Sequence, residues 1–418
     1  MNHLFLMLFA LIGGSVLLGA SLVAILIAER ALEPVAAVVA LAASIAAFWG
    51  FAQVTILNEG LEAVGYSLIF SAAAVAGGYA LASTLLAGMA LRPRINRLAQ
   101  TPPHTDAAPT VLLLSELEPP TYSARATAAA LEDLADEGLL RASIWVLPFL
   151  FMAQKTRYRA AGGTSPGSGE LEAVAERLAR ALRTRGITHV DTAACDGERS
   201  LSIRVLEAVN SGVRSIVVAQ TFVAESLEVD RAKRQVDALR LGEHGVDVSY
   251  ADALWSSTQC ASLVAARALS VAGDLSSCGV VLVGQAQPEE RSRIAGDFDL
   301  EETRFLNQVR MLLIERGVPE QQIHIAWADW RSPEVTGSVR HLAALGCRNV
   351  IVVPACFPLD SITTMLDLPL SVRQARVDQS VNVLTLHAWH DDPGLVEALR
   401  ATVTSAMDAR ESTSGVSP

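Results

Sequence analysis

The chain has 418 residues, of which 51% are hydrophobic and 18% charged, and its formal net charge at pH 7 is −11. This length exceeds one ordinary hydrophobic core and predicts two or three folding units. The acidic balance excludes a general nucleic-acid-binding protein, which would need a basic surface to neutralise phosphates. The cysteines show no ligand spacing and are interpreted as buried free thiols: Cys195, Cys260, Cys278, Cys347 and Cys356.

Three uninterrupted apolar segments, residues 4–28, 34–57 and 63–91, begin the chain. Each is long enough to span a bilayer as a helix. The first lacks the basic region and cleavage site of a secretory signal, so we expect it to remain as a membrane helix. Because the segments contain no charge or histidine well inside them, they indicate an anchor or a docking surface rather than a transport pathway.

Small side chains recur at four-residue spacing in the first and third segments. Ser15 and Gly19 lie in the first, and Ala74, Gly78 and Ala82 in the third. Such spacing either lets two helices approach closely or simply reflects an alanine-rich composition.

Charges beside the spans predict the orientation. A basic cluster follows the third span, at Arg92, Arg94 and Arg97. By the positive-inside rule, the C-terminal bulk is expected in the cytoplasm and Met1 outside. We therefore predict a multi-pass protein of a bacterial inner membrane, with lipid as one partner.

Residues 1–97 form the predicted membrane anchor, and the Pro/Thr/Ala-rich residues 98–109 a linker. Short β-branched runs then alternate with helical patterns, which predicts an α/β fold with parallel sheets covered by helices. We expect two such halves, residues 110–276 and 277–407, and a polar, disordered tail at 408–418. Strands are predicted at 111–114, 143–146, 189–193, 215–218, 246–250, 280–283, 324–326, 349–353 and 381–386.

Residues 349–375 hold the strongest site signal. A β-branched strand leads through a turn into a helical pattern, and this is where α/β sheets usually place a site. Asp360 occupies the position of an N-cap. Asp367 is seven residues further on, so both carboxylates are predicted on one helical face and could weakly bind a metal.

This segment resembles the ferrochelatases, class II chelatases that insert ferrous iron into a porphyrin. The family's His after the Asp is Ser361 here, and its essential Glu is Thr363. The later acidic pair is replaced by Pro369 and Ser371. The matching residues are Pro354, Phe357, Asp360, Ile362, Thr364, Asp367 and Leu368.

Two other segments extend the resemblance. Residues 158–166 are similar to the family's Y-x-x-I-G-G-x-S-P, and Trp330 begins a W-x-x-P like that of the family. The preceding apolar run, 144–152, is interpreted as an exposed lip or membrane contact, with a core strand as the alternative. The resemblance implies ligand-binding roles for Tyr158, Gly162, Gly163, Ser165, Pro166, Trp330 and Phe357.

The main departure lies at residues 281–288, where the family's metal-handling His is Gln285. A carboxamide neither accepts pyrrole protons near pH 7 nor binds Fe²⁺ as imidazole does. Thr363 removes the opposing carboxylate as well. Both catalytic positions implied by the family are thus substituted. No other residue is an obvious replacement, and five histidines are interpreted as ordinary polar residues: His189, His324, His341, His387 and His390.

The resemblance implies a chelatase-like fold of two Rossmann-like halves behind three transmembrane helices. The leading hypothesis is a non-catalytic subunit of a membrane complex that binds haem or another porphyrin, or serves a structural role. One alternative is an active ferrochelatase that uses Fe²⁺ despite its substituted residues. Another is a chelatase-like domain used only for protein contacts. Some ferrochelatases bind an iron–sulfur cluster partly through cysteines late in the chain. No such cluster is expected here, because the sequence has no cysteine after Cys356.

Overall fold

The computed structural model describes residues 2–57, 61–87, 109–187, 189–294, 297–390 and 392–414. The chain splits into two compact units, which are described separately. Unit 1 comprises Met1–Arg92 and Thr121–Thr164, and unit 2 comprises Pro93–Pro120 and Ser165–Pro418. Residues 121–164 thus group with the N-terminal helices, whereas the sequence placed them in the first α/β half. The predicted arginine cluster and most of the predicted linker lie outside the described residues.

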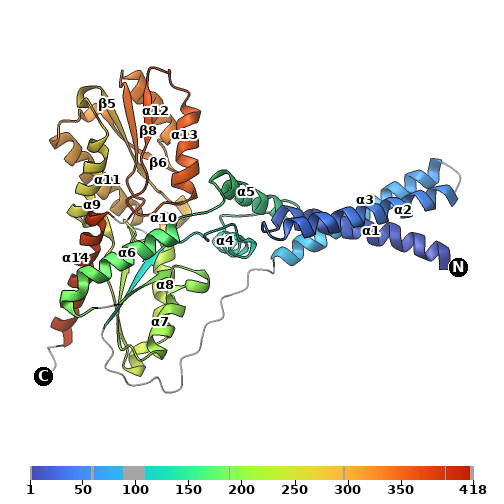
Figure 1. Ribbon diagram of the computed structural model, residues 1–418, viewed down its shortest axis with the longest axis horizontal. Coiled ribbons are helices and arrows are strands. Elements are labelled where there is room, and N and C mark those ends of the chain that lie inside the picture. The colour runs from blue at the N-terminus through green and yellow to red at the C-terminus, as the bar shows by residue number, and fades with distance from the viewer. Residues whose placement is uncertain are drawn as a thin grey trace. The chain divides into compact units, whose positions relative to one another are not determined.

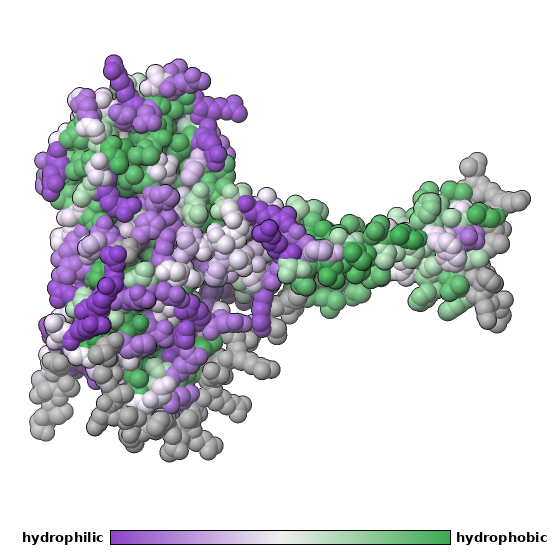
Figure 2. Space-filling model, in the orientation of Figure 1, coloured by the Kyte–Doolittle hydropathy of each residue, from purple (hydrophilic) through white to green (hydrophobic). Residues whose placement is uncertain are grey.

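Three long helices dominate unit 1: α1 (Asn2–Ile27), α2 (Glu33–Leu57) and α3 (Leu61–Ala87) (Figure 1). Each contains a stretch long and apolar enough to cross a membrane, as the sequence predicted. Hydrophobic residues cover most of the visible surface of these helices (Figure 2). This outward exposure of apolar side chains suits helices surrounded by lipid.

Gly19 of α1 and Gly78 of α3 each lie directly against the backbone of the other helix. A Cβ atom on Gly19 would collide with the carbonyl oxygen of Val75, and one on Gly78 with that of Val16. Backbones can meet this closely only where a side chain is missing. At Gly19 and Gly78, the small residues therefore allow the two helices to approach closely, which was one of the two interpretations of their spacing.

Helices α4 (Ala124–Asp136) and α5 (Leu147–Ala160) complete unit 1 and fasten the end of α1. Lys155 donates a hydrogen bond to the carbonyl oxygen of Ile25 at 3.0 Å and forms an ion pair with Glu33 at 2.9 Å. Tyr122 donates to the carbonyl oxygen of Ile27 at 3.1 Å. These donors satisfy carbonyls left free at the helix end. The α1–α2 connection and residues 121–164 consequently lie on the same side of the three-helix bundle.

The predicted strand at 143–146 is wrong. Residues 144–146 form a turn into α5, and Pro148 occupies the first helical turn, where its missing N–H breaks no hydrogen bond. Trp145 is half exposed and stacks on Tyr79 of α3, with ring centroids 5.6 Å apart. This apolar run is therefore not a core strand, and several of its side chains are partly exposed: Ile144, Trp145, Val146, Phe149 and Met152.

Unit 2 contains two four-stranded parallel sheets, in the orders β2-β1-β3-β4 and β6-β5-β7-β8 (Figure 1). The order is equivalent in both, so the two halves share one topology. All predicted strands except 143–146 are present. The strands are β1 (Thr110–Ser115), β2 (Val190–Ala194), β3 (Ser215–Gln220), β4 (Asp247–Tyr250), β5 (Cys278–Gly284), β6 (Ile323–Trp327), β7 (Asn349–Pro354) and β8 (Asn382–Thr385).

Alternating side chains of the central strands face two different layers. Val111 and Leu113 of β1 share one core with Val280 and Leu282 of β5, so the inner faces of both sheets contribute to a common interior. The even-numbered residues of β1 and the odd-numbered residues of β5 face separate outer cores. This two-residue period is what a strand covered on both faces requires.

Helices from both halves fill these layers. The common interior contains α6 (Gly167–Leu182), α9 (Thr258–Ser270), α11 (Phe298–Glu315) and α14 (Pro393–Ser414). The outer core of the first sheet contains α7 (Leu201–Asn210) and α8 (Leu227–Asp237). That of the second contains α12 (Val335–Ala344) and α13 (Leu368–Ala375). Shorter helical segments are Arg183–Arg185, Gly197–Arg199, Leu241–His244, Leu254–Ser256, Leu275–Ser277, α10 (Glu289–Ile294) and Glu320–Gln322.

The C-terminal helix corrects the prediction for the tail. Helix α14 continues to Ser414, so residues 408–414 are helical rather than disordered. Asp408 forms an ion pair with Arg185 at 3.0 Å, and Arg410 pairs with Asp247 of β4. Charged residues of this segment thus form ion pairs with charged residues of the first α/β half.

Candidate functional site

A cavity of about 260 Å³ lies in unit 2 at the carboxyl ends of the central strands. Glu116 follows β1, Thr221 follows β3, Gln285 follows β5 and Cys356 follows β7, and all four residues line the cavity. In each sheet, the second strand along the chain lies on one side of the first strand, and the third lies on the other side. Ligands of parallel sheets bind in the crevice that opens at such a switch point. The cavity thus uses the switch points of both sheets.

Three carboxylates gather in the first half of this cavity. Glu116, Glu118 and Glu228 line it, and Glu228 is paired with Arg291. Glu116 is exposed where it lines the cavity. Desolvation within the cavity, together with the charges of Glu228 and Glu118, raises the pKa of Glu116 above the usual range of a carboxylic acid. The group is suited to take up a proton at near-neutral pH.

Glu302 of α11 holds the turn after β5. Its carboxylate accepts hydrogen bonds from the backbone N–H of Gln285 at 2.6 Å and of Ala286 at 3.1 Å. Glu302 is 1% exposed, and burial raises its pKa to about 7. This buried carboxylate therefore determines where Gln285 lies.

Equivalent positions in the two halves carry different chemistry. Glu116 is the first residue after β1 and Gln285 the first after β5, and Glu118 and Gln287 follow two residues later. Carboxylates in one half thus correspond to carboxamides in the other. The Nε2 of Gln287, in a side chain 5% exposed, has no hydrogen-bond partner among the described residues. A ligand or water with an acceptor atom would satisfy this donor.

The structure brings together part of the predicted site. The cavity is lined by Gln285, Thr363, Ser165, Trp330, Phe357 and Asp360. Pro166 precedes α6, whereas Tyr158, Gly162 and Gly163 lie in unit 1. The two glycines have φ values of +95° and +91° and form the turn after α5, where Gly163 N–H donates to the Tyr158 carbonyl at 2.7 Å. Ser165 donates to Glu118 at 2.9 Å.

Of the two predicted metal ligands, Asp360 lines the cavity and Asp367 does not. Helix begins at Ile362, one residue after Ser361, and residues Thr363–Asp367 are π-helical, with Leu368 N–H bonded to the Thr363 carbonyl. A π turn has a longer period than an α turn, so a spacing of seven residues no longer selects one face. Asp367 is not among the residues that line the cavity.

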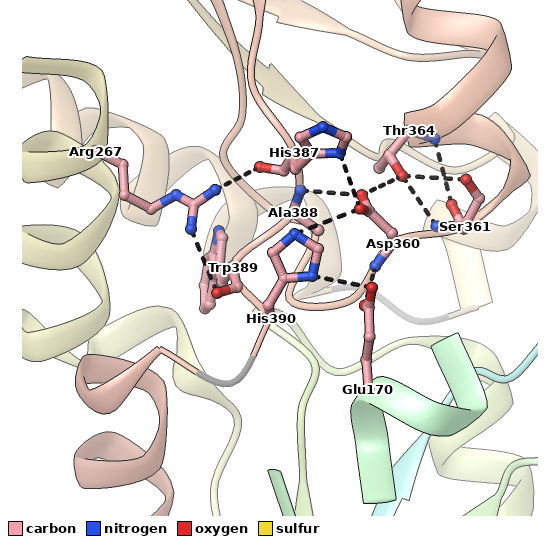
Figure 3. A network of polar contacts seen from close by, with 9 residues as sticks. All are labelled: Glu170, Arg267, Asp360, Ser361, Thr364, His387, Ala388, Trp389 and His390. Carbon is pink, nitrogen blue, oxygen red and sulfur yellow. Dashed lines mark hydrogen bonds and ion pairs between the residues drawn. The ribbon is translucent and has the colours of Figure 1, made fainter. Parts of the chain in front are cut away.

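Asp360 instead meets the segment after β8 (Figure 3). It is 5% exposed, and its Oδ1 accepts hydrogen bonds from Thr364 Oγ1 at 2.7 Å and Ala388 N at 3.0 Å. Its Oδ2 lies 3.2 Å from His387 Nδ1 and 3.5 Å from His390 Nε2. Two histidines that sequence reasoning treated as ordinary polar residues therefore converge on the most buried acid of this segment.

Glu170 of α6 completes the network. One of its oxygens accepts the backbone N–H of Asp360 at 2.8 Å, and the other pairs with His390 Nδ1 at 2.9 Å. Hydrogen bonding to Glu170 raises the pKa of His390. Arg267 donates to the carbonyl oxygens of His387 at 2.9 Å and Trp389 at 3.4 Å, which fixes the loop backbone. The only sequence signal for this site was the H-x-x-H spacing at a strand end.

Fold and site together define an α/β protein of two topologically equivalent parallel-sheet halves, in a chain that also has three long apolar helices. No model of a known protein family matches the chain, and no curated protein does.

Three solved structures match much of the chain at low sequence identity. SirB from Bacillus subtilis with Fe³⁺ is 11% identical with a TM-score of 0.46, over 73% of this chain and 98% of that one. The sirohydrochlorin chelatase SirB from Bacillus subtilis subspecies spizizenii, in complex with cobalt, is 11% identical with a TM-score of 0.45, over the same shares. DR2241 from Deinococcus radiodurans, described as structurally similar to chelatases, is 14% identical with a TM-score of 0.41, over 71% of this chain and 55% of that one. These values carry no inference about activity.

Proposed function

We propose that this chain is a membrane-anchored, chelatase-like protein whose unit 2 binds a tetrapyrrole at the cavity. The observation that carries the proposal is that one cavity joins Ser165, Gln285 and Phe357, which come from three separate segments compared with the ferrochelatases. Ligands of open parallel sheets bind at this edge of the strands.

The cavity chemistry suits part of a macrocycle. Glu116 and Glu118 offer acceptors for pyrrole N–H groups, and Gln287 offers a free donor. Negative propionate groups would be repelled by these carboxylates and are expected to point out toward solvent. A cavity of about 260 Å³ is smaller than most ligand pockets, so we expect one edge of the tetrapyrrole to enter and the rest to remain exposed.

In this proposal the protein does not insert metal itself. Gln285 and Thr363 stand where the resemblance implies a metal-handling imidazole and a carboxylate, and neither side chain accepts a proton near pH 7. The chain would act as an accessory subunit beside a complex in a bacterial inner membrane. Unit 2 would then lie on the cytoplasmic side, as the arginines after the third span favour.

A second candidate is metal insertion with Glu116 as the proton acceptor. Glu116 holds in the first half the position that Gln285 holds in the second, and its pKa is raised. Fe²⁺ would be the substrate metal. The remaining alternative, a domain used only for protein contacts, requires that no tetrapyrrole binds.

Titration of the purified full-length chain in detergent with porphyrin and haem tests the proposal. We expect a saturable shift of the porphyrin absorption band at micromolar ligand. Thr363→Trp should fill the cavity and weaken binding at least tenfold. Met365→Trp is the matched control, because Met365 lies in the same π turn, is partly exposed and is not among the cavity-lining residues. A chain that shows no spectral shift at high micromolar ligand would refute tetrapyrrole binding.

A further inference from the structure

The loop between β8 and α14 brings two imidazoles to one buried carboxylate. Ligand atoms of Asp360, His387 and His390 all lie within 4.8 Å of one another. We propose that these three side chains form a binding site for a divalent transition-metal ion of the Zn²⁺ or Co²⁺ type. The site shares Asp360 with the lining of the cavity but uses none of Glu116, Glu118 and Glu228, and it does not depend on tetrapyrrole binding.

The two separations from the Asp360 carboxylate match a tetrahedral ion. Metal–ligand bonds of 2.0–2.1 Å place neighbouring ligand atoms of a tetrahedral site about 3.4 Å apart. Asp360 Oδ2 lies 3.2 Å from His387 Nδ1 and 3.5 Å from His390 Nε2. Both imidazole nitrogens therefore already stand near the distance from the carboxylate oxygen that a shared ion requires. Imidazole and carboxylate together suit Zn²⁺, Co²⁺ and Fe²⁺ better than Ca²⁺ or Mg²⁺.

Surrounding groups orient the ligands as they do in built metal sites. The other oxygen of Asp360 is held by Thr364 Oγ1 and Ala388 N–H, at 2.7 and 3.0 Å. The other nitrogen of His390 faces Glu170 at 2.9 Å. A carboxylate on the remote nitrogen fixes the tautomer and strengthens the imidazole as a ligand. Figure 3 shows both rings directed at Asp360, with Glu170 below His390 at the other ring nitrogen.

Charge and access favour a cation as well. The side chains of Asp360 and Glu170 are 5% and 16% exposed, and they face the same imidazole. Nearby Arg267 donates to backbone carbonyls of the loop rather than to these carboxylates. The side chain of His387 is 75% exposed, so an ion can enter from solvent. Three protein ligands leave a fourth position for water or for an incoming ligand.

Cobalt titration of the full-length chain tests the site. The protein is purified without a polyhistidine tag, stripped with chelator, and titrated with Co²⁺ while its visible d–d absorption is followed. We expect one Co²⁺ per chain with tetrahedral intensity, displaced by Zn²⁺. Glu170→Gln should weaken binding about 10- to 100-fold, because it removes an orienting carboxylate. His387→Ala and His390→Ala should weaken it further.

A second histidine pair supplies the control. His324 and His341 have ring centroids 4.5 Å apart. His341→Ala should leave the cobalt spectrum unchanged. If His390→Ala fails to fold, His387→Ala decides the question, because its side chain is largely solvent-exposed. The proposal is overturned if the wild type binds no Co²⁺ at millimolar concentration, or if His387→Ala binds it as tightly as the wild type.

Discussion

At the scale of single residues, the cavity has side chains that can accept a proton near pH 7 in its first half and carboxamides that cannot in its second half. Glu116 and Gln285 hold equivalent positions in the two halves, yet only the carboxylate has a pKa that moves toward neutrality. Glu302 is a buried acid whose two hydrogen bonds from backbone N–H groups hold the Gln285 turn. Two predictions follow from these differences.

The first concerns metal insertion. We expect the wild-type chain to insert Fe²⁺ into a porphyrin at a rate close to background, because a positioned base typically contributes 10²- to 10⁴-fold. Gln285→His combined with Thr363→Glu should raise the rate in a continuous fluorescence assay of porphyrin loss. If the wild type is instead active and Glu116→Gln abolishes that activity, the enzyme candidate with Glu116 as proton acceptor replaces the accessory one.

The second concerns pH-dependent stability. The pKa of Glu302 is raised from 4.5 to about 7 in the folded chain. Folding therefore favours the protonated acid, and this contribution is complete below pH 4.5 and is lost as the pH rises to 7. The shift corresponds to about 3 kcal/mol. Between pH 5 and pH 8 the thermal midpoint of the wild type should fall, and Glu302→Gln should flatten this slope. Glu315→Gln, at an exposed residue of the same helix, is the control.

At the scale of elements, glycines decide how α1 and α3 meet, and short polar contacts decide where α1 ends. Gly78 is buried against the backbone of Val16, whereas nothing lies within 4 Å of where a Cβ on the adjacent Gly77 would be. A methyl group therefore fits at Gly77 but not at Gly78.

Substituting each glycine by alanine tests this contact. Gly78→Ala should destabilise the helix bundle by about 1–3 kcal/mol, because the new methyl group overpacks a backbone contact. Gly77→Ala should be neutral or stabilising by up to about 1 kcal/mol, since alanine is the better helix former. Thermal midpoints in detergent measure both. Equal losses for the two variants would show that α1 and α3 do not meet at Gly78.

At the scale of the whole molecule, contacts within unit 1 bear on the topology. Lys155 and Tyr122 bind carbonyls at the end of α1, so the α1–α2 connection lies on the same side of the helices as residues 121–164. Three spans also return the chain to that side after α3. The arginines that follow assign this side to the cytoplasm in our proposal.

Cysteine labelling of cells and inverted vesicles measures the orientation. The native cysteines among the described residues are buried, so they should give little background. Arg30→Cys and Glu289→Cys should react with an impermeant maleimide only in inverted vesicles, and Asn58→Cys only in intact cells. Arg30→Cys and Glu289→Cys labelled from opposite sides would contradict three spans with this orientation.

The sequence by itself determined the elements with strong periodicity. Three apolar spans follow from composition, and β-branched runs such as 280–283 and 349–353 mark buried parallel strands, because a strand covered on both faces must be apolar throughout. The same pattern was misleading at 143–146, where an apolar run forms a turn and the start of α5 on an exposed surface. Local composition does not distinguish a buried strand from an apolar surface beside a membrane helix.

Only the tertiary structure decided which polar groups meet. Helical spacing predicted Asp360 and Asp367 on one face, and it gave no sign that Asp360 meets His387 and His390. Glu170, which lies 190 residues earlier in the chain than Asp360, joins the same network. Parallel sheets bring the ends of distant strands to one edge, so contacts there depend on strand order and register. Neither is encoded in the local pattern around any one of these residues.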